Sequence, residues 1–401
     1  MNLASRRPSG ELTLLVGILL IAACLRAPFT GIPPVLGRIA ADFHLSTALA
    51  GAITTLPLLA FALLSPVSAL LAQRFGQART LLHGLLAIAA GIALRSAGAE
   101  WALFAGTALL GVGIAVGNVL LPSLIKRSFP NSIASLTGAY ALTMGVAATA
   151  GSALMVPMAD AWGWQVTLAS FLVLPLAAIA VWLPQLRGER AAAAASGPAV
   201  ATTPQAAPRI WRSALAWQVT LFLGLNSVMS YIAIGWLPAM LMEAGRSQAQ
   251  AGSLHGVLQL AIAVPGLVIG PLLRRMHDQR LAASGSAACM AAAFLDLAVL
   301  PQFALAWCIL LGIGSGTGFI LGLSFVGLRT RTPQQAVALS GMAQCVGYLL
   351  AASGPVLMGG LHDALAGWQV PLLVCTALAL LEALMGWLAG RNHSIGAEHR
   401  G

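Results

Sequence analysis

Long apolar runs separated by short polar turns fill the chain almost from end to end. Most runs hold 20 residues or more, and about 20 apolar residues in a helix cross a bilayer core about 30 Å thick. A helix also satisfies its own backbone hydrogen bonds, which lipid cannot do. The pattern predicts twelve transmembrane helices, at residues 12–35, 47–72, 79–97, 101–125, 132–158, 165–186, 213–242, 248–273, 281–300, 304–328, 335–361 and 367–389.

Composition and charge place these helices in a membrane and orient them. Hydrophobic residues make up 59% of the chain and charged residues 8%, whereas soluble domains carry about 25% charged residues. Of the 21 basic residues, 17 fall in one set of loops, three (Arg38, Arg95 and Arg246) in the opposite loops, and Arg26 inside a span. Basic loops stay on the cytoplasmic side. We therefore expect both termini in the cytoplasm of a bacterial inner membrane protein, and the net charge of +10 gives no reason to expect nucleic acid.

An internal repeat divides the spans into two sets of six. Gly163-Trp164-Gln165-Val166 recurs as Gly367-Trp368-Gln369-Val370, and Pro34 is matched by Pro238 at nearly the same offset. Between the copies, residues 187–212 are rich in Ala, Pro, Ser and Thr, as in a flexible linker. We predict an N-terminal half at 1–186, a cytoplasmic linker at 187–212 and a C-terminal half at 213–401. Two parallel six-helix halves with a site between them are the architecture of the major facilitator superfamily.

The residues of both halves resemble one family within that superfamily, the cyanate/nitroimidazole transporters. The resemblance lies in Leu25-Arg26-Ala27-Pro28, in Gly111-Val112-Gly113-Ile114 and in Gly235-Trp236-Leu237-Pro238. It implies an all-α membrane protein of two pseudo-symmetric six-helix halves.

The superfamily's loop signature between helices 2 and 3 is present only in part. Arg74, Gly76 and Arg79 match it, but Ala69 and Gln73 stand where the pattern has Gly and Asp. The three matching residues are predicted to serve gating on the cytoplasmic side. The missing Asp weakens the idea of a charge pair that latches one state.

Arg26 is the leading candidate for substrate binding. An ionisable side chain inside a span is a functional hypothesis by default, and Arg26 lies only about 4 Å from the midpoint of its span at 1.5 Å rise per residue. Thr30 is one turn further along the same face. A guanidinium here must meet water, a polar partner or an anionic solute. The alternative is a structural Arg paired with helix dipoles or Gln side chains.

Other polar residues in the spans form further candidates, several in i, i+4 pairs that share a helix face. Each could line a substrate site or hold helices together at roughly 0.6 kcal/mol. The predicted substrate-binding set is completed by Asn118, Asn226, Ser230, Gln259, Gln344 and Tyr348. His255, beside Gln259, is predicted to serve as such a helix contact. Asp296 and Glu382 fall in spans that the resemblance places at the periphery, so neither is expected to meet substrate.

These observations predict a secondary transporter for a small anionic or polar organic solute, cyanate-like, working by alternating access. The alternative is an exporter of small heteroaromatic compounds such as nitroimidazoles. No catalytic motif occurs, and the five cysteines form no C-x-x-C, so neither an enzyme, a cofactor nor a metal is expected. Because the first half has no carboxylate within its spans, we expect weak or no dependence on a proton gradient. The partners expected are the solute and the lipid bilayer, with the protein as a monomer.

Overall fold

The computed structural model describes residues 8–129, 132–195, 210–273, 276 and 278–395, and in these ranges it is helical with no strand. The N-terminal helices are α1 (Pro8–Thr30), α2 (Leu36–Asp42), α3 (Thr47–Phe75), α4 (Gln77–Arg95), α5 (Glu100–Ser128), α6 (Ile133–Ser170) and α7 (Val173–Ala195). The C-terminal helices are α8 (Ala214–Glu243), α9 (Gln248–Ala263), α10 (Pro265–Leu273), α11 (Arg280–Val299), α12 (Ala304–Leu328), α13 (Pro333–Leu365) and α14 (Gln369–Ala389). Short 3-10 turns occupy Pro33–Val35, Ile210–Arg212 and Pro301–Phe303.

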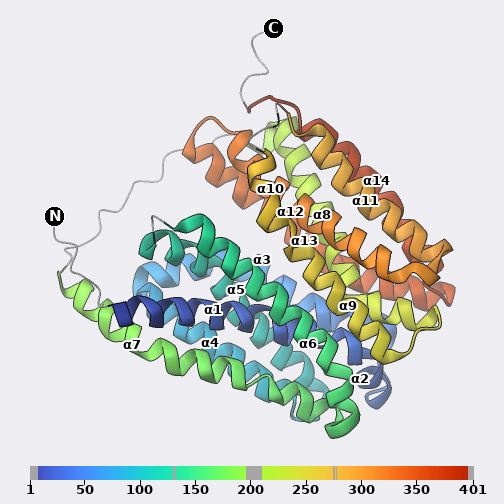
Figure 1. Ribbon diagram of the computed structural model, residues 1–401, viewed down its shortest axis with the longest axis horizontal. Helices are drawn as coiled ribbons and strands as arrows, with labels where there is room; N and C mark the ends of the chain where they lie inside the picture. Colours follow the sequence, from blue (N-terminus) through green and yellow to red (C-terminus); the bar gives the residue numbers. More distant parts are fainter. Residues whose placement is uncertain (1–7, 130–131, 196–209, 274–275, 277, 396–401) are drawn as a thin grey trace.

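Eleven helices in the described ranges are long and apolar enough to cross a membrane, and one of them accounts for two of the twelve predicted spans. It covers Leu136–Leu186, or 51 residues, which is about 75 Å of helix at 1.5 Å per residue. Gly163 interrupts it with φ 77° and ψ 158°, a conformation that favours glycine. The chain reverses at this glycine, and Figure 1 shows the long first part of α6 and the following α7 running in opposite directions. The predicted twelve-helix, all-α architecture is therefore confirmed.

Local sequence signals explain where the helices begin and end. Pro33 and Pro34 follow α1 and start a 3-10 turn, because proline cannot donate a backbone hydrogen bond. Ser46 caps α3 by accepting from the Leu49 backbone N–H at 3.2 Å. Ser247 and Gln250 form a reciprocal capping box at the start of α9.

The chain packs as two bundles, α1–α7 and α8–α14 (Figure 1). Glycines allow very close helix contacts within each bundle. A Cβ on Gly106 in α5 would lie 2.3 Å from the Arg95 backbone nitrogen, and one on Gly314 in α12 would lie 2.6 Å from the Ser286 carbonyl oxygen. Large apolar side chains such as Leu63 and Trp101 are mostly exposed, as suits a surface in lipid.

The segment between the bundles is partly helical. Residues 187–195, placed in the predicted linker, continue α7, and Ile210–Arg212 forms a 3-10 turn. Residues 196–209 lie outside the described ranges.

Hydrogen bonds between the two bundles gather at one end of the molecule. Around α9, Arg38 Nε donates to Gln248 Oε1 at 2.9 Å, and Gln248 Nε2 donates to the Pro34 carbonyl at 2.9 Å. Around α3, Thr55 Oγ1 donates to the Ala352 carbonyl at 2.8 Å. In Figure 1 the bundles meet near α2 and α9 and diverge towards the end where α1 begins and α14 ends. The structure is thus closed on the face opposite the start of α1 and the end of α14.

Candidate functional site

Arg26 lies on α1 where the two bundles face each other, and tyrosines from three other helices surround it. Its guanidinium lies within interaction range of the Tyr231 hydroxyl of α8. Tyr140 of α6 and Tyr348 of α13 lie within electrostatic range of the same charge. The chain has three tyrosines in all, so every tyrosine belongs to this cluster. Arg26 and Tyr140 come from the N-terminal bundle, and Tyr231 and Tyr348 from the C-terminal bundle.

Two phenylalanines extend the cluster into aromatic walls. Phe29 meets Tyr231 edge to face, with ring centroids 6.1 Å apart and planes at 74°. Phe61 of α3 meets Tyr348 in the same way, at 5.8 Å and 72°. Edge-to-face pairs fix ring orientation and are worth about 0.5–1.5 kcal/mol beyond the buried area. The cation therefore sits between rings held in defined positions.

A cavity of about 240 Å³ adjoins this cluster. Its walls are Phe61, Ala115, Asn118, Val119, Gln344 and Tyr348, from α3, α5 and α13. Gln344 Nε2 donates to Ser340 Oγ at 3.0 Å, which leaves its carbonyl oxygen available. Asn118 makes no side-chain hydrogen bond within the described ranges and can offer both a donor and an acceptor. Three of the predicted site residues, Asn118, Gln344 and Tyr348, thus share one cavity, next to Arg26.

Thr30 and Gln259 lie instead in a hydrogen-bonded chain between the bundles. Gln259 Nε2 lies 3.2 Å from His255 Nε2, and His255 Nδ1 lies 2.9 Å from Ser152 Oγ. Ser152 Oγ donates to the Thr30 carbonyl at 3.0 Å. Since the Ser152 proton is used there, Ser152 accepts from His255 Nδ1–H. Thr30 Oγ1 donates to the Arg26 carbonyl at 3.1 Å, so this chain reaches from the closed face to the Arg26 backbone.

Asn226 and Ser230 point into the C-terminal bundle rather than towards the cavity. Asn226 Nδ2 donates to Glu382 Oε1 of α14 at 3.1 Å. Ser230 Oγ donates to the Asn226 carbonyl at 2.6 Å and lies 2.5 Å from Ser315 Oγ of α12. These two residues therefore contact neighbouring helices of their own bundle.

The loop with the partial superfamily signature forms a tight turn. Gly76 separates α3 from α4 with φ 89°, and the Arg74 guanidinium lies 5.3 Å from the Phe75 ring centre. Arg79 is exposed. Among the described residues, neither arginine forms an ion pair. Gln77 makes the firm contact here, since its Nε2 donates to the Leu120 carbonyl at 2.9 Å and to Ser123 Oγ at 2.6 Å.

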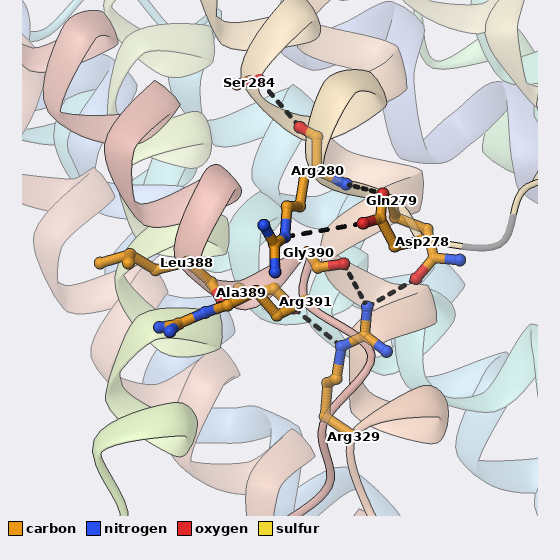
Figure 2. Close-up of polar contacts among 9 residues, drawn as sticks. All are labelled: Asp278, Gln279, Arg280, Ser284, Arg329, Leu388, Ala389, Gly390 and Arg391. Atoms are coloured by element: carbon orange, nitrogen blue, oxygen red, sulfur yellow. Dashed lines mark hydrogen bonds and ion pairs between the residues drawn. The ribbon is translucent and has the colours of Figure 1, made fainter.

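A matching junction occurs in the C-terminal bundle, where α11 begins (Figure 2). Arg329 is buried there, and its Nε donates to the Ala389 carbonyl at 2.7 Å. Its Nη2 donates to Gln279 Oε1 at 2.5 Å and to the Gly390 carbonyl at 3.1 Å. Gln279 thus joins the start of α11 to the end of α12, as Gln77 joins α4 to α5. Each bundle thus has a buried glutamine at this junction, which the sequence analysis missed.

The sequence analysis also missed Tyr140, Tyr231, Phe29 and Phe61. Tyr231 follows Ser230 directly, and Tyr140 is an isolated polar ring in an apolar span. The rarity of tyrosine in this chain was the available signal.

Comparison with known proteins agrees with the fold. Residues 18–352 match the profile of the Major Facilitator Superfamily. A 2-nitroimidazole transporter of Escherichia coli (strain K12) is 53% identical over 386 residues, which cover 96% of this chain and 97% of the relative. A cyanate transport protein of the same organism is 27% identical over 377 residues, covering 92% and 96%. The crystal structure of a nucleoside transporter shares the fold with a TM-score of 0.74 at 12% identity, covering 94% of this chain and 100% of the other.

Proposed function

We propose, from the premise that this chain belongs to the major facilitator superfamily and is one of its secondary transporters, that it carries a small, flat heteroaromatic solute bearing a nitro group. A 2-nitroimidazole is the type of compound we have in mind. The solute would bind between the two bundles at Arg26 and in the adjoining cavity. This is the second of the two solute classes that the sequence analysis kept open.

The observation that carries the proposal is the pairing of one guanidinium with aromatic walls. A guanidinium presents a planar fork of donors that fits two oxygens on one atom, as in a nitro or carboxylate group. The rings of Tyr231 and Tyr348, each held edge to face by a phenylalanine, offer apolar faces for a flat ring. Asn118 and Gln344 add amide groups that can meet ring nitrogens.

The site favours this solute over cyanate. Cyanate is a linear three-atom anion, so it could use the Arg26 charge but would leave the aromatic walls without a partner. A cavity of about 240 Å³ also exceeds what three atoms fill. The greater similarity to the 2-nitroimidazole transporter, at 53% against 27% identity for the cyanate protein, agrees with this choice.

Alternating access follows from where the bundles touch. Contacts such as Thr55 with Ala352 and Ser152 with His255 close one face. The basic loops predict that the ends of the chain lie in the cytoplasm, and on that prediction we assign the closed face to the periplasm and the structure to an inward-open state. Rocking of the bundles about Arg26 would then expose the site to the other side.

Binding to the purified protein tests the proposal. We expect 2-nitroimidazole to raise the thermal midpoint and cyanate to leave it unchanged. Imidazole lacks the nitro group that would meet Arg26, and benzoate lacks the ring nitrogens that would meet the amides. Each should therefore bind more weakly than 2-nitroimidazole. Stabilisation by cyanate without any effect of 2-nitroimidazole would overturn the proposal in favour of a small-anion transporter. Exchange of labelled 2-nitroimidazole by reconstituted protein would establish transport.

A further inference from the structure

Glu382 and Asn226 form an isolated polar pair inside the C-terminal bundle. Glu382 in α14 is fully buried and Asn226 in α8 is 1% exposed. Asn226 Nδ2 donates to Glu382 Oε1 at 3.1 Å. Within the described ranges, two oxygens of the pair, Asn226 Oδ1 and Glu382 Oε2, have no hydrogen-bond partner. Two unpaired acceptors thus lie on two side chains that already touch.

Neighbouring helices enclose the pair with small or uncharged groups. A Cβ on Gly318 of α12 would lie 2.4 Å from Asn226 Nδ2 and 3.2 Å from Glu382 Oε1, so only glycine leaves room for the pair. From α11, Met290 Sδ lies 3.5 Å from Asn226 Nδ2. No ion pair of the described residues includes Glu382. The other ionisable groups on the four helices are Tyr231, Glu243, Arg280, Cys289, Asp296, Cys308 and Cys375.

An ionised carboxylate would be costly in this position. Burying a charge without a counter-charge costs several kcal/mol, and a group in that situation tends to become neutral. A neutral carboxylic acid carries an O–H donor as well as an acceptor. One proton on Glu382 Oε2 could be donated to Asn226 Oδ1, which would give both unpaired oxygens a partner at once.

We propose that Glu382 binds a proton and forms with Asn226 a two-hydrogen-bond ring of carboxylic acid and amide. The ring connects α14 to α8, the helix that carries Tyr231, without placing a charge in the bundle. The proton stays bound during transport, so the contact between α8 and α14 stays uncharged while the C-terminal bundle moves. Glu382 therefore has a fixed structural proton, a role that the prediction of a peripheral residue did not include.

Infrared spectroscopy of the full-length protein in detergent tests the protonation directly. We expect the wild-type minus E382Q difference spectrum at neutral pH to contain the C=O band of a protonated carboxyl, shifted in D₂O. Asp296, the other acid within a span, gives a matched control, because D296N should leave this band in place. A difference spectrum with carboxylate bands only would overturn the proposal.

Stability and exchange measurements test the ring and the fixed proton. The E382Q side chain can both accept from and donate to Asn226, so this variant should keep the wild-type thermal midpoint and exchange rate. E382A should lower the midpoint by several degrees because Asn226 loses its partner. Equal midpoints for E382A and wild type would overturn the ring. Loss of exchange in a stable E382Q protein would show that the proton must leave during transport. Stabilisation of the wild type by sodium but not by potassium would show a cation, and not a proton, between the two oxygens.

Discussion

Replacing Arg26 by alanine should weaken solute binding by one to two orders of magnitude while leaving the fold intact. The wild-type guanidinium lies within electrostatic range of all three tyrosines. A hydrogen bond to a charged group is worth about 1.5–3 kcal/mol. At 1.4 kcal/mol per tenfold in affinity, losing one such bond to the solute weakens binding by roughly 10- to 150-fold. Insertion should not suffer, because an Arg at the centre of a span itself costs about 2.5–3.5 kcal/mol.

Lysine at the same position separates charge from geometry. R26K keeps the charge but loses the planar fork, so we expect weaker binding than wild type and stronger binding than R26A. Thermal shift with 2-nitroimidazole on the three purified proteins measures this order. R246A is the matched control, because Arg246 lies outside the site and donates to the Gln302 carbonyl. Wild-type affinity in R26A would refute the reasoning and make Arg26 a structural residue.

Three further predictions concern contacts between helices outside the site. R38A should favour opening of the closed face by at least about fivefold, because it removes the two hydrogen bonds that Arg38 donates to Gln248 Oε1 and one such bond is worth about 1 kcal/mol. Distances between spin labels on the two bundles would show the opening, and an unchanged distribution would contradict it. R329A should cost about 2–4 kcal/mol, since it leaves the buried Ala389 carbonyl and Gln279 Oε1 without a donor, whereas the Gly390 carbonyl keeps the Gln279 backbone N–H; a thermal midpoint equal to wild type would count against it. G106A should destabilise by about 1–3 kcal/mol, because its Cβ would meet backbone atoms that cannot yield, whereas G37A, with open space around it, should be neutral in the same melting experiment.

The fold followed from the sequence because membrane spans are set by local properties. Twenty apolar residues cross a bilayer whatever their neighbours are, and helices need no distant partner for their backbone. The boundary between two spans near Gly163 could also be predicted, since the apolar run breaks there and the repeated Gly163-Trp164 motif lies at the break. Arg26 could be singled out because a charged side chain inside a span needs water or a polar partner, whichever helices pack around it.

The direction of the other polar side chains could not be obtained in this way. An i, i+4 pair shows that two residues share a face, but it does not show which neighbour that face meets. Asn226 and Ser230 share a face that meets α12 and α14, whereas Gln344 and Tyr348 share one that meets the cavity. The tyrosine cluster depends on three helices far apart in sequence. Their rotation about their own axes is fixed by close packing at glycines and cannot be derived from a single helix.

The placement of every tyrosine beside Arg26 gives the protein a built-in spectroscopic label. Incorporation of fluorotyrosine would produce one resonance each for Tyr140, Tyr231 and Tyr348, with no background from elsewhere in the chain. Tyr140 comes from the N-terminal bundle, and Tyr231 and Tyr348 come from the C-terminal bundle. Rocking of the bundles therefore changes the distance from each tyrosine to the Arg26 guanidinium, and with it the position of each resonance. Solute binding and the change of access could therefore be followed in the unmutated protein, with the signals assigned by three single Tyr→Phe substitutions.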